Sequence, residues 1–446
     1  MEKFDVAIIG GGSAGLAALK HLSNLGKQAI LIEGGRKIGT KNVSGGLLYS
    51  KNTTIGKVYN VEDVYDNFIT DAPVERQITK YILHATSKDK MFSLDLTPTH
   101  NYQTNFGYSV LLNKLLPWFA KEALKSAEKT GGGIVTGIHV KSIIWKDENT
   151  IIIETDELEP FQVKAVIAAD GVNSEIAQIT GARSKFTQSD LYQGVKVVVK
   201  LPEEIIEERF EIANNEGAAH LFAGDVTLNH IGGGFLYTNK DTLSVGAVYH
   251  YDSLMEKPTE PFELVNALLS NPFVMELIKD EVPKSKENYK NLSKEEELRT
   301  RFKANKLIKD WKELHHTHYS PSGVKQLLAN GKYKTKEEIK NKVDSIHDEL
   351  VSKYDIEFEL NYVELEYSAK LVPDGKRCRM KKPYFKNILF IGDAAGRGIF
   401  VGPRIEGLNV GIDDAVRAAE AVSNAIDKNS FHSNILGERY RRLVEE

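Results

Sequence analysis

FDVAIIGGGSAGLAAL, residues 4–19, is the stretch that decides the fold. Its apolar start is typical of a buried strand, and its end begins a helix. The turn between them has the pattern G-x-G-x-x-G. In this pattern Gly10 permits a tight turn, Gly12 lets backbone N–H groups approach a pyrophosphate, and Gly15 allows the helix to pack closely on the strand. Because the positive end of the helix faces the turn, the sequence predicts a dinucleotide-binding βαβ unit.

The second strand of this unit supports the same interpretation. The apolar run 28–32 ends in Glu33. This is the distance from the glycine turn at which an acidic side chain can hold ribose hydroxyls. The alternative is an ordinary βαβ turn without a ligand, which this agreement disfavours. We therefore expect a bound dinucleotide.

A further segment for nucleotide contact lies near the end of the chain. ILFIGDAAG, residues 388–396, is typical of a strand that ends in Gly-Asp ahead of a helix. Asp393 can hydrogen-bond a sugar-chain hydroxyl, or it can simply cap the helix. Gly402 and Gly407 would let backbone approach a flat ring at a helix N-terminus, where the helix dipole stabilises negative charge on a reduced flavin.

The composition of the chain limits the classes of protein to which it can belong. The chain has 446 residues, of which 41% are hydrophobic and 27% charged, as expected for a soluble globular protein of several domain-sized units. Its formal charge of -4 gives no field that favours nucleic acid. The single cysteine, Cys378, excludes an internal disulfide and a resident iron–sulfur cluster. We expect a cytoplasmic protein, since there is no signal peptide and no apolar run long enough to span a bilayer.

The pattern along the chain predicts two sheets and an insertion. Period-two alternation from Tyr192 to Tyr251 favours antiparallel strands with one covered face. Residues 283–357 are rich in Lys and Glu with helical spacing, which indicates an inserted helical element. The predicted fold class is α/β plus α+β. The predicted domains are a Rossmann-like cofactor domain (1–85, 105–185 and 362–430), an antiparallel-sheet substrate domain (86–104 and 186–283) and a helical insertion (284–361).

These segments together resemble the large FAD-dependent superfamily that includes aromatic hydroxylases, geranylgeranyl reductases and electron-transfer-flavoprotein:quinone oxidoreductases. Within it, the sequence resembles the FixC-type members of the quinone oxidoreductase family. The matching segments are KNVSGGLLY (41–49), AADGVNSEI (168–176), LPEEIIEERF (201–210), HIGGGFLYTNKDTLSVG (230–246), YSAKLVPDG (367–375) and GDAAG (392–396).

The resemblance implies an enzyme with a p-hydroxybenzoate-hydroxylase-like fold and FAD as its cofactor. Its implied activity is to pass electrons from an electron-transfer flavoprotein to a quinone, with the iron–sulfur cluster on a separate ferredoxin-like subunit. No metal site is expected. The cofactor-binding residues that we expect are Gly10, Gly12, Ser13, Ala14, Gly15, Glu33, Gly34, Lys41, Asn42, Ser44, Gly45, Gly46, Val140, Asp170, Gly171, Gly392, Asp393, Gly402, Gly407 and Leu408.

The resemblance also places the segment GGGFLYTN beside the isoalloxazine ring. Gly233 and Gly234 would let a flat headgroup come close to backbone, and Tyr237 and Thr238 would donate hydrogen bonds to a quinone carbonyl. These four residues are the predicted catalytic residues. The alternative is a glycine-rich β-bulge in an antiparallel sheet.

Three weaker signals concern surfaces. The histidines of LHHTHY (314–319) are expected to lie at the surface and not to bind metal. A basic helix over 299–312, with Leu298, Phe302, Ile308 and Trp311 predicted on one face, fits contact with anionic lipid or packing on its own domain. A basic run, 376–382, fits docking of an acidic redox partner or a solvated turn. A place at the cytoplasmic face of the membrane is therefore a further expectation.

Other functions stay open at the level of sequence. One is a geranylgeranyl-type ene reductase of isoprenoid lipids, although the loop GTKNVSGG (39–46) lacks the cysteine that such enzymes often carry. Another is an NAD(P)H-dependent hydroxylase. A third is a docking subunit of an electron-bifurcating flavoprotein complex, in which the helical insertion serves as a binding arm.

Overall fold

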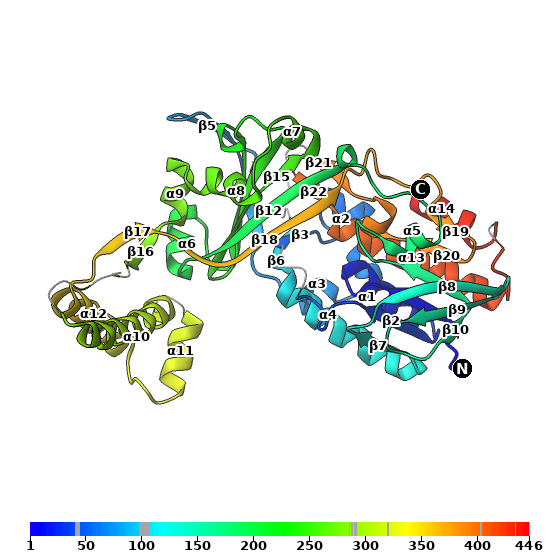
Figure 1. The fold of residues 1–446 in the computed structure, drawn as a ribbon, viewed down its shortest axis with the longest axis horizontal. Helices are drawn as coiled ribbons and strands as arrows, with labels where there is room; N and C mark the ends of the chain where they lie inside the picture. The colour runs from blue at the N-terminus through cyan, green and yellow to red at the C-terminus, as the bar shows by residue number, and fades with distance from the viewer. Residues whose placement is uncertain are drawn as a thin grey trace.

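Three assemblies of secondary structure follow one another along the long axis of the computed structural model (Figure 1). A mostly parallel sheet with its helices lies at the end that holds both chain termini. A larger mixed sheet lies in the middle, and a helical arm lies at the far end. The structure describes residues 1–40, 45–97, 107–284, 286, 289, 292–318, 321–401, 404–432 and 434–445.

The mostly parallel sheet is built around the stretch that opens the chain. Strand β1 (Val6–Ile9) pairs in parallel with β2 (Ala29–Glu33) on one side and with β11 (Ala165–Ala168) on the other. All residues of β1 and β11 are buried, as expected for strands covered on both faces. The order of the six strands is β19-β20-β11-β1-β2-β7. Strands that come later in the sequence therefore lie on both sides of β1. Ligands bind at the carboxyl ends of strands at such a switch point.

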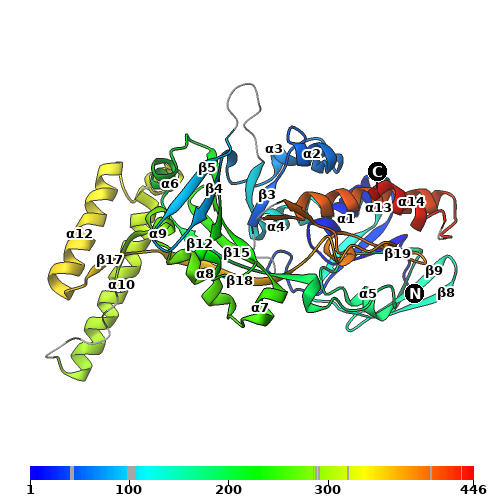
Figure 2. The ribbon, with the colours of Figure 1, turned by 90° about the horizontal axis from the view of Figure 1, so that it is seen from above.

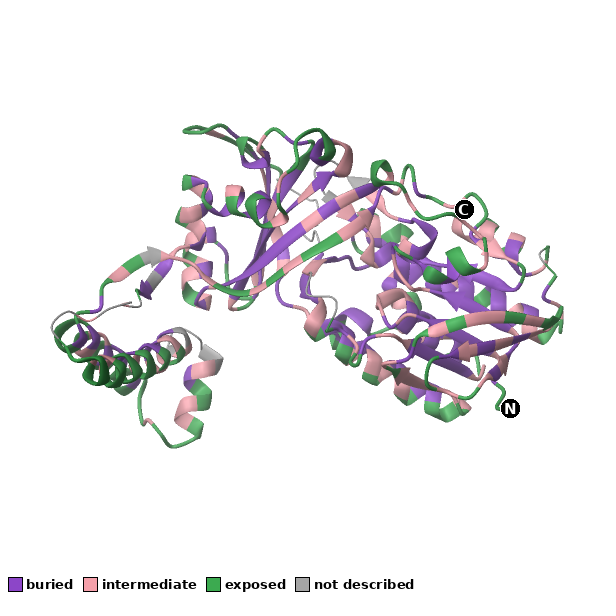
Figure 3. Ribbon diagram, viewed as in Figure 1, coloured by how far each residue is buried: buried purple, intermediate pink, exposed green. Residues whose placement is uncertain are grey.

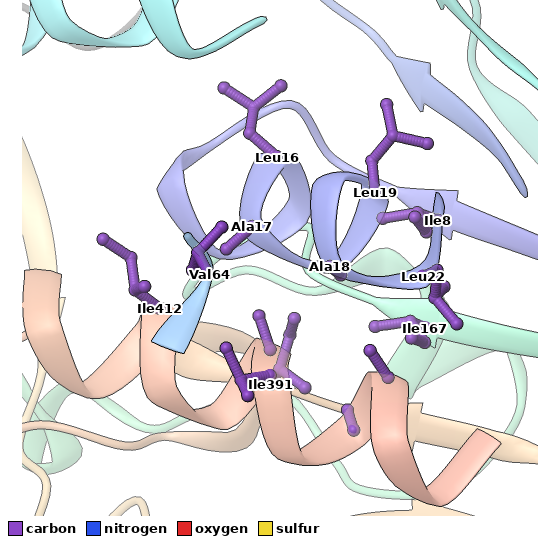
Figure 4. Packing of buried hydrophobic residues seen from close by; sticks show 14 of the residues in the cluster. Ile8, Leu16, Ala17, Ala18, Leu19, Leu22, Val64, Ile167, Ile391 and Ile412 are labelled. Atoms are coloured by element: carbon purple, nitrogen blue, oxygen red, sulfur yellow. The ribbon is translucent and has the colours of Figure 1, made fainter. Parts of the chain in front are cut away.

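Helices and a small sheet cover the two faces of this sheet. On one face, α1 (Ser13–Asn24) packs between α4 (Leu112–Ala127) and α13 (Leu408–Asp427). Figure 2 shows α1 and α13 side by side, and Figure 4 shows Leu19 and Leu22 of α1 near Ile8 of β1 and Ile167 of β11. The other face is covered by an antiparallel sheet of three strands. The remaining elements of this region are β7 (Gly133–Thr136), β8 (Val140–Asp147), β9 (Thr150–Thr155), β10 (Phe161–Val163), β19 (Tyr384–Phe385), β20 (Ile388–Phe390), α5 (Glu175–Ile179) and α14 (Gly437–Glu445).

The larger sheet has nine strands in the order β18-β12-β15-β14-β13-β4-β6-β3, with β5 added to β4. One face packs on short helices, mainly α6 (Glu203–Phe210), α8 (Pro261–Leu269) and α9 (Pro272–Ile278), in a separate hydrophobic core. Figure 3 shows both cores as buried strands beneath a more exposed shell of helices and loops. The strands are β3 (Gly45–Leu48), β4 (Gln77–Thr86), β5 (Met91–Asp95), β6 (Tyr108–Leu111), β12 (Leu191–Lys200), β13 (Glu216–Gly224), β14 (Gly232–Thr238), β15 (Thr242–His250) and β18 (Val363–Pro373).

The predicted fold class is confirmed, but several strands lie in a different sheet from the one that we expected. Strands β3, β4, β6 and β18 fall in the ranges predicted for the cofactor domain, yet they pair in the larger sheet. Strand β6 ends at Leu111, and α4 begins directly after it at Leu112. Short strands such as β3 and β6 show too few residues for a period-two pattern. Segments of the two sheets therefore alternate along the chain more often than the predicted domain boundaries allow.

The insertion forms an arm with its own core. Helices α10 (Lys294–His318) and α12 (Lys336–Tyr354) pack against each other, and α11 (Pro321–Ala329) lies beside them. A two-stranded neck of β16 (Asp280–Pro283) and β17 (Phe358–Asn361) joins the arm to the body. The residues of the arm core include Ala304, Ile308, Trp311, Val343, Ile346 and Leu350.

The predicted apolar face of α10 is wrong. Ile308 and Trp311 are buried against α12, whereas 62% of Leu298 and 74% of Phe302 is exposed. Successive residues of a helix turn by about 100°, so positions 302 and 308 lie about 120° apart on the helix surface. In the described ranges of the chain, no helix is long and apolar enough to span a membrane.

The neck makes the arm separable. Pro283 lies opposite Phe358 in the neck, so the dipeptide Asn-Gly, which favours a tight hairpin turn, can replace residues 284–357. We expect this shortened protein to keep the near-ultraviolet circular dichroism of the body and to unfold in a cooperative transition, because the arm core is separate from the cores of both sheets. A protein that aggregates or loses its near-ultraviolet signal would show that the body depends on the arm.

Candidate functional site

A large cavity of about 810 Å³ opens at the carboxyl ends of β1 and β11. The glycine turn after β1 lines one part of it, and the Gly392 segment and the start of α13 line another. The two predicted nucleotide segments, from opposite ends of the chain, therefore meet at one cavity. The predicted residues that line it are Gly10, Gly12, Ser13, Ala14, Glu33, Gly34, Val140, Asp170, Gly171, Gly392, Asp393, Gly407 and Leu408.

The remaining predicted cofactor residues have other positions. Gly15 packs beneath the turn, and Gly45 and Gly46 line a neighbouring small cavity. Lys41, Asn42, Ser44 and Gly402 lie outside the described residues.

The geometry of the glycine turn explains each glycine. Gly10 has a φ of 109°, and a Cβ there would lie 2.3 Å from the carbonyl oxygen of Ala169. A Cβ at Gly15 would lie 1.9 Å from the carbonyl oxygen of Gly10, so only glycine lets α1 pack here. A Cβ at Gly12 would meet no protein atom within 4 Å. The space beside Gly12 is thus open toward the cavity that this residue lines.

Two helices point their N-termini at the large cavity. The N-caps are Gly12 for α1 and Gly407 for α13, neither helix has a side-chain cap, and neither has an acidic residue in its first turn. The first N–H groups of each helix have no partner within the helix and carry partial positive charge. A pyrophosphate suits the first terminus, and the electron-rich edge of a reduced flavin suits the second. The uncapped termini and the open space at Gly12 fit FAD.

Acidic side chains are held at defined points of this cavity. Glu33 accepts hydrogen bonds from Gly11 N (2.7 Å) and Gly35 N (2.6 Å), which fixes its carboxylate beside the glycine turn. Asp170 accepts from Ser174 Oγ (2.7 Å) and Ile176 N (3.0 Å), so it shapes the loop after β11 as well as lining the cavity.

A buried ion pair supports the Asp393 side of the cavity. Burial raises the pKa of the Asp393 carboxyl, while Lys370 acts in the opposite direction. Asp414 accepts a hydrogen bond from Gly392 N (3.1 Å) and lies 2.8 Å from Arg397 Nε. Burial raises the pKa of Asp414 to about 6, against the effect of Arg397. Sequence reasoning missed Arg397 and Lys370, both of which line the large cavity.

A small cavity of about 190 Å³ adjoins the large one. Ser368, Lys370, Val372 and Ile405 line both cavities and form a shared wall. The volume is below the roughly 300–1,000 Å³ typical of sites for drug-sized ligands, so the small cavity suits a single ring and not a second nucleotide. Its other lining residues include Gly45, Gly46, Lys196, Phe235, Tyr237 and Glu406.

Polar groups of the small cavity come from three separate elements. Lys196, on β12, is only 4% exposed, and burial lowers its pKa to about 7 although Glu366 acts to raise it. Glu406, on β22 (Arg404–Glu406), accepts a hydrogen bond from Tyr49 Oη (2.7 Å). Tyr237 is contributed by β14. A ring-sized ligand would thus meet an amine, a carboxyl group and a phenol.

Only one of the predicted catalytic residues lines the small cavity. Tyr237 does, and Gly233 shares its face of β14 because side chains alternate along a strand. Gly234 faces the helical core, where a Cβ would lie 3.1 Å from Leu268 side-chain atoms. Thr238 is fully buried, and its Oγ1 accepts a hydrogen bond from Ala218 N (2.8 Å). The structure therefore gives Gly234 and Thr238 packing roles away from both cavities.

Comparison with known proteins identifies the family. Residues 4–235 match the pyridine nucleotide-disulphide oxidoreductase family. This chain belongs to that family. It is an FAD-dependent oxidoreductase, in agreement with the glycine turn and the uncapped helix termini that face the large cavity.

Individual relatives agree with this assignment. Protein FixC of Salmonella typhi is 29% identical over 444 residues, which cover 99% of this chain and 82% of the relative. The probable electron transfer flavoprotein-quinone oxidoreductase YdiS of Escherichia coli is 26% identical, covering 100% of this chain and 82% of the relative. A solved geranylgeranyl bacteriochlorophyll reductase-like protein of Thermoplasma acidophilum superposes with a TM-score of 0.60 at 16% identity, covering 100% of this chain and 84% of that one. This last likeness shows the shared fold.

One of the histidines predicted at the surface is buried instead. His315 is buried, stacks on Trp311 and lies 3.5 Å from Asp280 of the neck. Within the described ranges, no cluster of three or more His, Cys, Asp or Glu side chains could hold a metal ion.

Gly12 offers a direct test of the large cavity. In Gly12→Ala the new methyl group meets no protein atom, so we expect unchanged thermal stability. The methyl group occupies the approach of the pyrophosphate, and we expect the Kd for FAD to rise about tenfold or more, measured by fluorescence titration. Gly133→Ala is the matched control, because a Cβ on β7 is also free of contacts and lies outside this cavity. Equal affinities in both variants would place the pyrophosphate elsewhere.

Proposed function

We propose that this chain passes electrons from an electron-transfer flavoprotein, through FAD in the large cavity, to a quinone that is reduced in the small cavity. A ferredoxin-like subunit carries the iron–sulfur cluster in this scheme, and the quinone is reached at a membrane surface. The observation that carries the proposal is the wall that the two cavities share. The similarity to FixC and to YdiS supports the same function.

The chemistry of the two cavities suits electron transfer. FAD, when bound, accepts and releases electrons and supplies the redox step itself. The protein has to hold the cofactor, exclude water and place the acceptor ring next to it. The small cavity does this with a largely buried surface: Phe235 and Val372 give apolar walls, and Tyr237 and Lys196 give polar groups for carbonyl oxygens.

Apolar side chains on the larger sheet support contact with a membrane surface. Strand β5 is an added strand that pairs only with β4. Its residues Phe92 and Leu94, with Leu96 just beyond, alternate along the chain, and each is at least 44% exposed. Alternate positions of a strand share a face, so the three side chains form one exposed apolar edge that can enter the interfacial region of a bilayer.

Reconstitution tests the proposed function. We expect the purified chain to hold FAD, and we expect the reduced electron-transfer flavoprotein of the same organism to reduce that FAD and then duroquinone under anaerobic conditions, followed by absorbance. We also expect an iron-containing small subunit to co-purify with the chain and the complex to float with anionic liposomes.

Other outcomes would identify other functions. No partner-dependent reduction of the flavin or of the quinone would overturn the proposal. Rapid bleaching of the flavin by NADPH alone would instead favour a pyridine-nucleotide-dependent reaction. Saturation of an isoprenoid lipid, detected by mass spectrometry, would favour an ene reductase.

The basic loop before β20 is the proposed docking site for the electron-transfer flavoprotein. Arg379, Lys381 and Lys382 are exposed, whereas Arg377 is paired with Asp252. The loop packs directly on the wall of the large cavity, since a Cβ at Gly375 would lie 2.1 Å from the carbonyl oxygen of Gly398. A partner with an acidic surface that binds this loop would therefore dock beside the wall of the large cavity.

Charge reversal tests this docking site. We expect Arg379→Glu combined with Lys382→Glu to raise the KM for the flavoprotein about tenfold at low ionic strength, with a smaller effect at high salt because the interaction is screened. Lys121→Glu combined with Lys129→Glu is the control, because these exposed residues lie on and just after α4. If both pairs of substitutions change KM equally, the basic loop has no special role.

A further inference from the structure

We infer that Lys196 delivers a proton to a carbonyl oxygen of the quinone in the small cavity, an inference that rests on the proposed function. The amine lies on the central part of β12, far from the strand ends where lysines reach solvent, and it lines the small cavity.

The position of Lys196 follows from the strand pattern of β12. The stretch GVKVVVKL puts Val195, Val197 and Val199 into the helical core of the larger sheet. Alternation then places Lys196 on the opposite face, which the small cavity occupies. Opposite Lys196 in the sheet stand Gly246 of β15 and Ser368 of β18. Glycine at 246 makes room for the ring of Phe235, another residue of the small cavity, because a Cβ at 246 would lie 2.5 Å from Phe235 Cζ.

The Lys196 amine lies beside β3 at the small cavity. A Cβ at Gly45, on β3, would lie 3.1 Å from Lys196 Nζ. Gly45 itself lines the small cavity. The absence of a side chain at this position thus gives a ligand in the small cavity access to the amine. The register also puts Lys370 opposite Gly194, on the same face as Lys196, so the two lysines lie diagonally across β12 and β18.

Titratable groups from several elements surround Lys196. Glu366 of β18 acts on it directly, and Lys370 of β18, Glu406 of β22 and the phenol of Tyr237 of β14 line the same small cavity. Burial is the largest influence and disfavours the ammonium form, while Glu366 favours it. The pKa of about 7 therefore lets the amine exist in both protonation states near neutral pH. A proton-transfer group works best when its pKa lies near the working pH.

The proton-transfer step balances as follows. The quinone takes two electrons from the reduced cofactor, and each carbonyl becomes a hydroxyl. At one oxygen an O–H bond forms as an N–H bond of the Lys196 ammonium breaks, and the neutral amine then takes a proton from solvent. The second hydroxyl takes its proton from water. The group is active only while protonated, so the rate must fall as the pH rises through about 7.

Three substitutions test this step. Lys196→Met removes the proton and keeps the apolar length of the side chain. Lys196→Arg keeps a positive charge that does not dissociate in proteins. Lys200→Met is the matched control on the same strand, because Lys200 pairs with Asp241 and lines neither cavity.

We expect kcat for duroquinone to fall about 100-fold or more in Lys196→Met and in Lys196→Arg, the range for loss of a general acid. The remaining rate should no longer change with pH near 7. Lys200→Met should keep the wild-type rate and pH profile. FAD content, measured by absorbance, should be the same in all four proteins.

Binding gives a readout that is independent of turnover. We expect calorimetric titration of the oxidised protein with duroquinone to give a Kd that weakens about tenfold between pH 6 and pH 8.5, because a hydrogen bond from an ammonium group is stronger than one from a neutral amine. In Lys196→Arg the Kd should not depend on pH. Duroquinone has no free ring position, so it cannot add to the amine.

The outcomes separate this inference from the proposed function. If the wild type reduces duroquinone and Lys196→Met matches it in kcat, pH profile and binding, Lys196 delivers no proton although the function stands. If Lys196→Arg keeps the wild-type rate, the charge matters and the proton does not, which also overturns the inference. If the wild type holds FAD but reduces no quinone with any donor, the proposed function fails, and the role of Lys196 fails with it.

Discussion

The cofactor site depends on a contact among three small residues. Ala14 lies in the first turn of α1, Gly392 follows β20, and Gly411 lies in the first turn of α13. A Cβ added at either glycine would already be in van der Waals contact, at 3.4–3.5 Å, with the Cβ of Ala14. This contact sets two helices from opposite ends of the chain against each other at their N-terminal ends. Larger side chains at these positions would separate the helices and with them the two positive termini. The cofactor site exists because this junction is tightly packed.

Rigid polar groups behind the cavity support this junction. Asp414 holds the backbone of Gly392 and pairs with Arg397, and Arg397 also donates to the carbonyl oxygen of Val444 in α14 (3.1 Å). Removing one partner of a buried ion pair costs about 3–5 kcal/mol, since the other charge stays buried. The Gly392 turn is thus fixed before any ligand arrives. A preformed cradle of this kind reduces the entropy that binding has to overcome.

The sequence predicted the lining of the large cavity better than that of the small cavity, for a physical reason. A glycine that has to adopt φ of 109° or allow contact at 1.9 Å leaves a local pattern, and Gly10 and Gly15 stand in such a pattern. Lys196 leaves no such pattern, because its place in the small cavity depends on which face of β12 meets strands from elsewhere in the chain. One charged residue between buried valines in GVKVVVKL was the available signal. The face of α10 was predicted wrongly because Ile308 and Trp311 pack on α12, a partner that periodicity alone cannot place.

The hydrogen bonds between Tyr49, just after β3, and Asn409 of α13 have a consequence for folding during synthesis. The amide of Tyr49 donates to Asn409 Oδ1 (2.9 Å), and Asn409 Nδ2 donates to the carbonyl oxygens of Tyr49 and Tyr59, across a sequence separation of up to 360 residues. The N-terminal part of a chain leaves the ribosome first. The glycine turn after β1 therefore emerges long before α13, the helix that completes the large cavity. Contacts of such long range form slowly. During synthesis the nascent chain therefore carries a half-built nucleotide site, which can close only after Asn409 has emerged.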